Sequence, residues 1–340
     1  MENQVTLKEK FENYKTANPT TRIREAAKQL GVSEAELLDI NPNNILLQPD
    51  FENILNDVPG LGEVMALTRN DFAVHERKGT YSKASFHGQI GLVTNPDIDL
   101  RLFMHAWTYA FAVNENERKS LQFFNRFGEA IHKIYLTEKS DELAYRILVE
   151  KYRLVDPPAV RIEIKPFHTI SEKLDEDIDV LGFQEEWKNL KDTHDFFGLL
   201  KKYEISRLQS MRLAPKGFTF QIPNNLVESL LKTVSSGGIE CMVFAGNKSC
   251  LQIHTGKAEK IVRTGPWINV LDPKFNLHLN DGAIDSLWIV KKPTNLGLVH
   301  SVEAFDREGN LIVQFFGKRK PNIPERDDWR QIVKTLENQL

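Results

Sequence analysis

The sequence predicts an α+β fold that is built twice, each half a large antiparallel β-sheet with flanking helices. Segments of the first half recur in order in the second half. Alternating apolar and polar residues fill long stretches without intervening helices, and each half closes on a helical pattern. Because 340 residues exceed what one hydrophobic core usually organises, we expect two domains, residues 1–165 and 166–340.

The duplication is clearest where residues 62–79 are placed over residues 239–256, which pairs Met65 with Met242 and Gly79 with Gly256, among others. After a small insertion, the segment "FNRFGEAIHKIY" falls on "FDREGNLIVQFF" near the end of the second half. Ordered blocks with small gaps between them indicate an internal repeat rather than a chance match.

The elements follow from periodicity. Residues 21–38 carry apolar side chains at helical spacing, and residues 140–152 and 327–339 form the closing helical pattern of each copy. Between them lie alternating segments such as "DFAVHERKG" and "LIVQFFGK", separated by Gly, Asn and Asp turns, which predict strands.

Composition excludes several classes of protein. A net charge of −3 argues against a dedicated nucleic-acid binder, and two cysteines, Cys241 and Cys250, suit a reducing compartment better than a disulfide framework. The N-terminus is charged and lacks the apolar stretch of a secretory signal. The most apolar run, residues 103–113, is shorter than the roughly 20 residues of a membrane span. We therefore expect a cytoplasmic protein without membrane insertion.

Functional residues should more often be those that the two copies do not share. His194 begins a strongly amphipathic helical pattern, and Thr21 stands at its place in the first copy. A helix N-terminus disfavours imidazolium, and neutral imidazole is the form that binds metals. Asp192 or Thr193 could cap this helix. Spacing alone leaves two interpretations open, a metal ligand and a polar residue ahead of a packed face.

Arg101 stands where the second copy has His278. Strand alternation places Asp99, Arg101 and Phe103 on one face, opposite two leucines. From this pattern, a solvated arginine on an outer face is as good an interpretation as a functional one.

Two short basic tracts, residues 291–293 and 317–320, predict solvated loops or, alternatively, contacts to carboxylates or phosphates. Residues 23–38 read like a helix-turn-helix. The corresponding residues 197–211 lack that signature, and the domain is not basic, so a packing element repeated in both copies is the better explanation. Nucleic acid is not an expected partner.

Several stretches, in this order and spacing, resemble a known family: "ALTRNDFAVHERKGTY", "THDFFGLLKKYEISR", "MVFAGNKSCLQIHTG", "LDPKFNLHL" and "WIVKKPT". They are similar to the HemS/ChuS/HmuS family of bacterial cytoplasmic hemin-binding and hemin-degrading proteins. The likeness covers nearly the whole chain and includes the doubled architecture.

The resemblance implies that His194 is the proximal ligand to heme iron. Arg101 would lie on the distal side with Phe103 as an aromatic contact, which places heme in a cleft between the two copies. The other heme contacts that carry over to matching positions are Arg207, Phe244, Lys292, Gln314, Phe316 and Arg319. The cations suit the two propionates, and the aromatic rings suit the macrocycle.

Two further positions bear on the resemblance. Phe316 stands where members of the family have tyrosine, so this position offers no phenol hydroxyl. His75 matches an accessory heme contact of the first half, although a surface histidine on a strand is the simpler interpretation.

The implied activity is reductive, oxygen-dependent ring opening that releases iron for iron acquisition, a heme oxygenase-like oxidoreduction in which Arg101 and His194 act as the catalytic pair. The alternative is a non-enzymatic carrier that passes heme to a separate oxygenase. No strand–GxGxxG–helix fingerprint is present, so electrons are expected from an external donor such as a partner reductase. A membrane heme-uptake transporter is the other expected partner.

Overall fold

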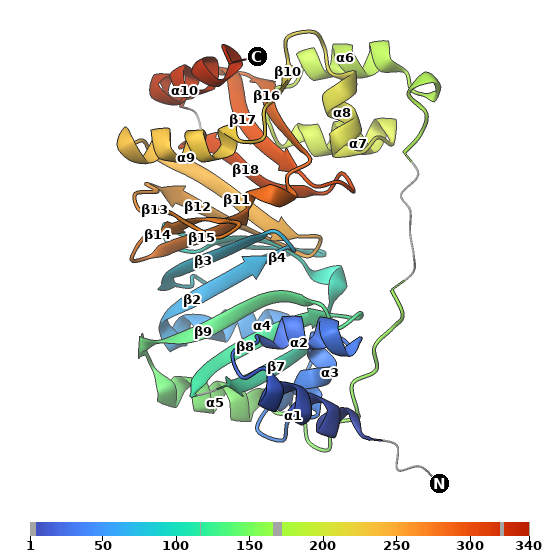
Figure 1. The fold of residues 1–340 in the computed structure, drawn as a ribbon, viewed down its shortest axis with the longest axis vertical. Coiled ribbons are helices and arrows are strands. Elements are labelled where there is room, and N and C mark those ends of the chain that lie inside the picture. The colour runs from blue at the N-terminus through green and yellow to red at the C-terminus, as the bar shows by residue number, and fades with distance from the viewer. Residues whose placement is uncertain (1–4, 116, 166–171, 320–322, 340) are drawn as a thin grey trace. The chain divides into compact units, whose positions relative to one another are not determined.

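The computed structural model describes residues 5–115, 117–165, 172–319 and 323–339, and it confirms the predicted α+β class (Figure 1). These residues form two nine-stranded sheets, with strand orders β1-β7-β8-β9-β2-β3-β15-β14-β13 and β10-β16-β17-β18-β11-β12-β6-β5-β4. Each sheet therefore takes strands from both repeats, which the repeat pattern alone did not predict.

The helices are α1 (Leu7–Ala17), α2 (Ile23–Leu30), α3 (Glu34–Asp39), α4 (Phe51–Asp57), α5 (Glu142–Tyr152), α6 (Val180–Lys188), α7 (Asp195–Tyr203), α8 (Arg207–Leu213), α9 (Leu226–Ser236) and α10 (Asp327–Glu337). The strands encoded by the first half are β1 (Ile45–Leu47), β2 (Gly62–Arg69), β3 (Ala73–Thr80), β4 (Ser85–His87), β5 (Ile90–Thr94), β6 (Asp99–Phe103), β7 (Trp107–Glu115), β8 (Arg118–Asn125) and β9 (Ala130–Ser140). Those of the second half are β10 (Thr219–Ile222), β11 (Cys241–Asn247), β12 (Cys250–Gly256), β13 (Ile261–Thr264), β14 (Trp267–Leu271), β15 (Phe275–Asn280), β16 (Ser286–Thr294), β17 (Gly297–Phe305) and β18 (Leu311–Gly317).

The chain divides into two compact units. The N-terminal unit comprises Met1–Thr68, Glu76–Phe167 and Asn247–Leu251, and the C-terminal unit comprises Arg69–His75, His168–Gly246 and Gln252–Leu340. Each unit thus includes a short segment from the other half of the sequence. The predicted boundary between residues 165 and 166 falls at the edge of a segment outside the described residues.

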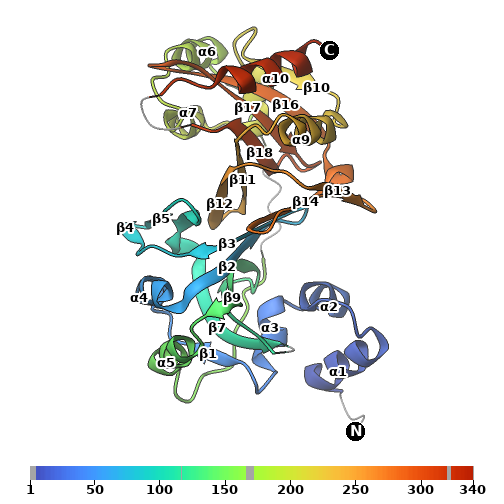
Figure 2. The ribbon, with the colours of Figure 1, turned by 90° about the vertical axis from the view of Figure 1, so that its left-hand side faces the viewer.

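In the N-terminal unit, helices cover both faces of the strands, as Figure 2 shows. Alternate residues of β7 explain this arrangement. Ala110 and Ala112 pack with α4 and α5, whereas Phe111 and Val113 pack on the opposite face with α3. The closing helix predicted over residues 140–152 is α5 and is confirmed.

Helices α2 and α3 form the helix-turn-helix-like element. Gly31 has φ +67° and ends α2, a left-handed conformation that favours glycine, and Ser33 begins α3 through a capping box with Glu36. Helix α3 is buried against the sheet, and Glu34 forms a buried ion pair with Lys133 of β9. A helix packed in this way cannot enter a DNA groove, which supports its interpretation as a packing element.

The C-terminal unit repeats this arrangement. Ile289 of β16 packs with α9 and α10, whereas its neighbour Val290 packs on the other face with α6, α7 and α8. The closing helix predicted over residues 327–339 is α10. The same two-sided packing in both units follows from the internal duplication.

Two predictions from the sequence, one for His75 and one for residues 291–293, are wrong. His75 is not a surface histidine, because it is fully buried in β3 and its ring lies 5.0 Å from that of Phe275. Residues 291–293 do not form a solvated loop, because they belong to β16 and the Lys292 residue is 2% exposed. In the second basic tract, Lys318 pairs with Glu240 at 2.7 Å, and residue 320 lies outside the described residues.

Within the described ranges, helices long and apolar enough to span a membrane are absent. Both cysteines are free and buried, as expected of a small apolar side chain in the core. Burial raises the pKa of each thiol to about 12.

A fully buried histidine, His132 of β9, is held between two hydroxyl groups in the N-terminal unit. Its Nδ1 lies 2.7 Å from Oγ1 of Thr68, and its Nε2 lies 2.6 Å from the hydroxyl of Tyr81. Burial lowers the pKa of His132 from 6.5 to about 3, so the ring is neutral in the folded protein at neutral pH. Unfolding exposes the ring to water and restores its ordinary pKa.

We therefore expect acid to destabilise the N-terminal unit through His132. At pH values below the pKa of His132 in the unfolded chain, the unfolded chain binds one more proton than the folded protein. The free energy of unfolding should therefore fall by up to about 1.4 kcal/mol for each pH unit as the pH is lowered from roughly 6 to 4. Urea unfolding at several pH values, compared for the wild type and His132→Gln, measures this slope. Equal slopes in the two proteins would show that His132 does not carry the effect.

Candidate functional site

His194 begins α7, as the sequence predicted, and is its N-cap residue. The imidazole does not pack as a core side chain, because 89% of it is exposed. The apolar residues that follow divide between two faces of the helix: Phe196 and Leu199 are buried, whereas Phe197 is 73% exposed. His194 and Phe197 are three positions apart and therefore lie on one face of α7, which is open to a ligand.

Asp192 fixes the position of this imidazole. Its Oδ1 accepts a hydrogen bond from Nδ1 of His194 at 2.6 Å and another from the backbone N–H of His194 at 2.8 Å. Asp192 does not cap α7 by bonding its first-turn N–H groups, which differs from the expected role, because its side chain is engaged by His194 itself. The backbone hydrogen bond from His194, then the ring contact, lower the pKa of Asp192, and the nearby charge of Arg319 contributes.

Four predicted residues, Phe244, Lys292, Gln314 and Phe316, lie on one face of the C-terminal sheet. Across β11, β18 and β17, Phe244 is opposite Gln314, which is opposite Glu303. One step along the same face, Phe316 is opposite Ser301. Because directly opposed residues project to the same side of a sheet, this register places the aromatic and polar groups together.

Lys292 belongs to the same face and forms a buried charge cluster there. Its Nζ donates to Glu303 Oε1 at 2.8 Å, and Ser301 donates to the same oxygen at 2.7 Å. Arg207, at the start of α8, grips Glu303 with two hydrogen bonds, from Nε at 2.7 Å and from Nη2 at 2.9 Å. Two cations thus share one fully buried carboxylate, and the cluster keeps one net positive charge.

The charges of this cluster are strongly coupled. Burial by itself raises the pKa of Glu303, but the charges of Arg207 and Lys292 outweigh it and hold that pKa far below its usual value. Burial lowers the pKa of Lys292 to about 8, although the carboxylate of Glu303 counteracts it. Glu303 is therefore ionised at neutral pH, and the positive charge of Lys292 is lost near pH 8. The Arg207 side chain, 26% exposed, is the accessible edge of the cluster.

Aromatic rings surround these cations. The ring of Phe196 lies 4.8 Å from Lys292 Nζ and 5.5 Å from the guanidinium carbon of Arg207. Phe244 and Phe316 form a tilted pair with ring centroids 4.9 Å apart. The face thus combines apolar aromatic surface with positive charge, as recognition of a flat apolar anion requires.

Two predicted residues belong to the N-terminal unit. Arg101 and Phe103 lie on the same face of β6, with the alternation that the sequence predicted. Arg101 is 31% exposed at its side chain and forms an ion pair with Asp99, two residues earlier on that face. The adjacent strand β5 places Leu92 opposite Arg101 and Ile90 opposite Phe103. The guanidinium is therefore held by a carboxylate beside partly exposed apolar side chains.

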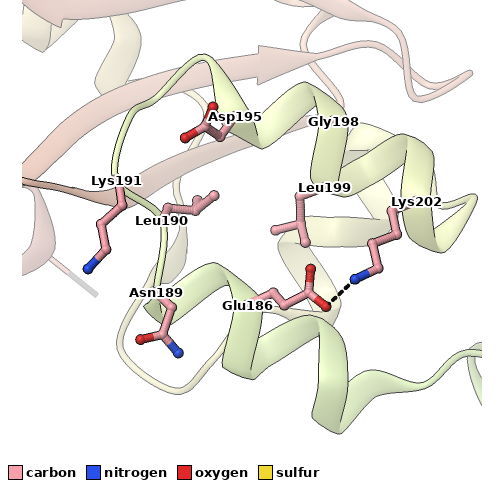
Figure 3. A pocket seen from close by; sticks show the side chains of 8 residues that line it. All are labelled: Glu186, Asn189, Leu190, Lys191, Asp195, Gly198, Leu199 and Lys202. Atoms are coloured by element: carbon pink, nitrogen blue, oxygen red, sulfur yellow. Dashed lines mark hydrogen bonds and ion pairs between the residues drawn. The ribbon is translucent and has the colours of Figure 1, made fainter.

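A groove of about 350 Å³ lies along another face of α7, toward α6 (Figure 3). Figure 3 shows the ion pair between Glu186 and Lys202, which are 2.5 Å apart, with Asp195 and Gly198 along the same side of the helix. The predicted site residues do not line it. The groove is therefore separate from the face that carries His194 and Phe197.

Sequence reasoning missed Glu303 altogether. A glutamate between apolar residues of the strand "SVEAF" is a signal for a buried ion pair, and it predicts that cationic partners lie nearby. Asp192 was identified only as a helix cap, because its contact with the His194 ring depends on the turn geometry.

Comparison with known proteins places the chain in a family. The model of the haemin-degrading HemS.ChuX domain matches residues 31–152 and 204–336. The hemin transport protein HmuS of Yersinia pestis is 36% identical over 340 residues, which cover 98% of each chain.

Two solved structures are similar over nearly the whole chain. Holo-PhuS, a heme-binding protein from Pseudomonas aeruginosa, has a TM-score of 0.93 and 42% identity, covering 96% of each chain. The heme degrading enzyme ChuS of Escherichia coli O157:H7 has a TM-score of 0.89 and 32% identity, covering 96% of this chain and 97% of ChuS. The chain therefore belongs to the family of the haemin-degrading HemS.ChuX domain, which it matches in both halves.

Proposed function

We propose that the chain binds heme through His194 and opens the porphyrin ring in a reductive, oxygen-dependent reaction that releases iron. The observation that carries this proposal is an exposed imidazole whose Nδ1 is bound to Asp192, which leaves Nε2 as the nitrogen available to a metal. The relatives support it, since PhuS is a heme-binding protein and ChuS a heme degrading enzyme.

The residues of the C-terminal unit fit the chemistry of heme. A porphyrin is flat and apolar, and Phe244 and Phe316 offer aromatic surface to it. Its two propionates are anionic, and the cluster of Lys292, Arg207 and Glu303 has one positive charge left to pair with a carboxylate. Gln314 and Arg319 would add polar contacts. Phe316 has no hydroxyl, so its role here is packing.

Arg101 would act on the face of the iron opposite His194. A guanidinium has several N–H groups, so it can keep its ion pair with Asp99 and still donate to a small iron-bound ligand. Heme, when bound, would supply the iron at which oxygen is reduced; Arg101 would donate a hydrogen bond that orients the oxygen, and Phe103 would exclude water. Electrons would come from a partner reductase.

A carrier is the second candidate function. The 89% exposure of the His194 side chain in the protein alone leaves the ligand open to transfer, and the relative HmuS is a hemin transport protein. A carrier would receive heme from a membrane uptake transporter and deliver it to a separate oxygenase. It would use the same residues to hold heme, so the two functions differ in turnover rather than in binding.

A single-turnover experiment separates the two functions. Protein loaded with hemin is mixed with a reductant and oxygen, with catalase present to remove free peroxide. An enzyme yields a defined open tetrapyrrole and free iron, identified by mass spectrometry and an iron chelator. Heme that is retained under these conditions, or bleached only without catalase, would indicate a carrier.

His194→Ala should abolish the axial imidazole signature in optical and resonance Raman spectra and weaken hemin binding at least tenfold. His105→Ala, which removes an exposed histidine that is not among the proposed heme contacts, is the matched control and should bind as the wild type does. A wild-type spectrum in the His194 variant would defeat the ligand assignment.

Arg101→Ala should retain hemin binding and slow turnover, by about 100-fold if the guanidinium contributes as a single preorganised donor does. Arg101→Lys, which keeps the charge but loses the planar donor set, should recover only part of the rate. Single-turnover rates and the spectrum of the ferric distal ligand measure both effects. An unchanged rate in Arg101→Ala would count against the catalytic assignment.

Hemin affinity should fall as the pH rises through about 8, because Lys292 loses its proton there and the cluster loses its net positive charge. Titrations of hemin between pH 7 and pH 9 measure this dependence, and Lys292→Met should flatten it. Hemin dimethyl ester, which has the same iron but no carboxylates, is the control. An equal pH dependence for the ester would assign the effect to the iron rather than to the propionates.

A further inference from the structure

The turn that precedes α7 ties the proposed iron ligand to a charged acceptor. One oxygen of Asp192 receives both the ring Nδ1–H and the backbone N–H of His194, at 2.6 and 2.8 Å. The backbone N–H of Asp195 donates to the carbonyl of Asp192 at 3.2 Å, which closes the turn around this contact. The ring and the chain entering α7 are therefore fixed by the same residue.

The chemical nature of the acceptor matters for the electronic state of the ligand. A carboxylate draws the Nδ1 proton toward itself more strongly than a neutral carbonyl does, and this increases the electron density at Nε2. A more basic imidazole binds ferric iron more tightly relative to ferrous iron. The axial ligand and its hydrogen bond are among the means by which a protein sets the reduction potential of heme iron.

The pair is confined to the second repeat. At the offset that aligns His194 with Thr21, Asp192 aligns with Pro19, so neither the ring nor the carboxylate has an equivalent in the first repeat. Residues that serve the shared fold would be expected in both copies. His194 and Asp192 therefore do not serve a feature common to both copies, which favours a role at the ligand over a role in the turn alone.

We propose that Asp192 is a positioning residue that holds His194 as a carboxylate-bound, Nδ1-protonated axial ligand and biases bound heme toward the ferric state. The proposal rests on the proposed heme binding through His194. The hydrogen bond to Asp192 makes the imidazole electron-rich. An electron-rich axial ligand suits activation of oxygen better than reversible storage of oxygen.

The test removes the charge of Asp192 and keeps the shape of its side chain. Asp192→Asn retains a side chain of the same size. The control Asp195→Asn removes the same charge from the residue that follows His194, whose side chain faces the groove of Figure 3. For each hemin-loaded protein we would measure the iron–histidine stretching frequency of the ferrous form by resonance Raman and the ferric/ferrous midpoint potential.

In Asp192→Asn we expect a lower stretching frequency and about tenfold weaker ferric binding relative to ferrous binding. This ratio corresponds to a rise of about 59 mV in the midpoint potential. Asp195→Asn should match the wild type. Unchanged values in Asp192→Asn would overturn the proposal. An equal change in both variants would also overturn it, because loss of any nearby negative charge would then explain the effect.

A second measurement guards against a local change of the turn. In His194→Gly, imidazole or 1-methylimidazole is supplied in solution as the axial ligand; only imidazole can donate a hydrogen bond to Asp192. Adding Asp192→Asn should change the spectrum with imidazole and leave it unchanged with 1-methylimidazole. Equal effects with both ligands would overturn the proposal.

These results also separate this inference from the proposed function. If His194→Ala keeps the wild-type spectrum, the ligand assignment itself fails. If His194→Ala loses the signature while Asp192→Asn retains the wild-type frequency and potential, heme binding through His194 stands and only the role of Asp192 is rejected.

Discussion

The C-terminal site depends on one buried carboxylate that must remain charged. Glu303 is fully buried, and a lone ionised carboxylate in that place would cost several kcal/mol. Arg207 and Lys292 compensate this cost, and their bonds to Glu303 hold both cations near the ring of Phe196, with Lys292 also near Phe316. Removing one cation would still leave Glu303 paired with the other, whereas removing both would leave an uncompensated buried charge, at a cost of about 3–5 kcal/mol. The arrangement proposed to receive an anionic ligand is thus set by folding.

The fold could largely be predicted from the sequence because it depends on periodicity and on repetition. Residues 140–152 and 327–339 could be assigned as helices from apolar spacing, and the buried leucines flanking Arg101 followed from alternation along one strand. The repeat pattern does not contain the strand order. Long-range pairing decides which strands of one copy join the sheet of the other. Local propensity contains no information about this pairing.

The candidate site was predictable in its residue types and only partly in its contacts. Lys292 was identified as a cation near an anionic ligand, but its burial and its bond to Glu303 depend on a register between β16 and β17 that no short motif encodes. His75 shows the same limit, because one polar residue in an alternating strand can face either side. Resemblance indicated the proposed heme contacts. The structure added Glu303, and it showed that Asp99 and Asp192 bind Arg101 and His194.

The division into compact units has a consequence for synthesis of the protein. The N-terminal unit includes residues Asn247–Leu251, which the ribosome adds only after nearly half of the second repeat. The unit cannot reach its full set of contacts while it is the only part of the chain outside the exit tunnel. A gene cut at the repeat boundary would yield a first half that lacks this segment and a second half that lacks Arg69–His75. Each fragment could then complete itself only by borrowing the missing piece from another polypeptide.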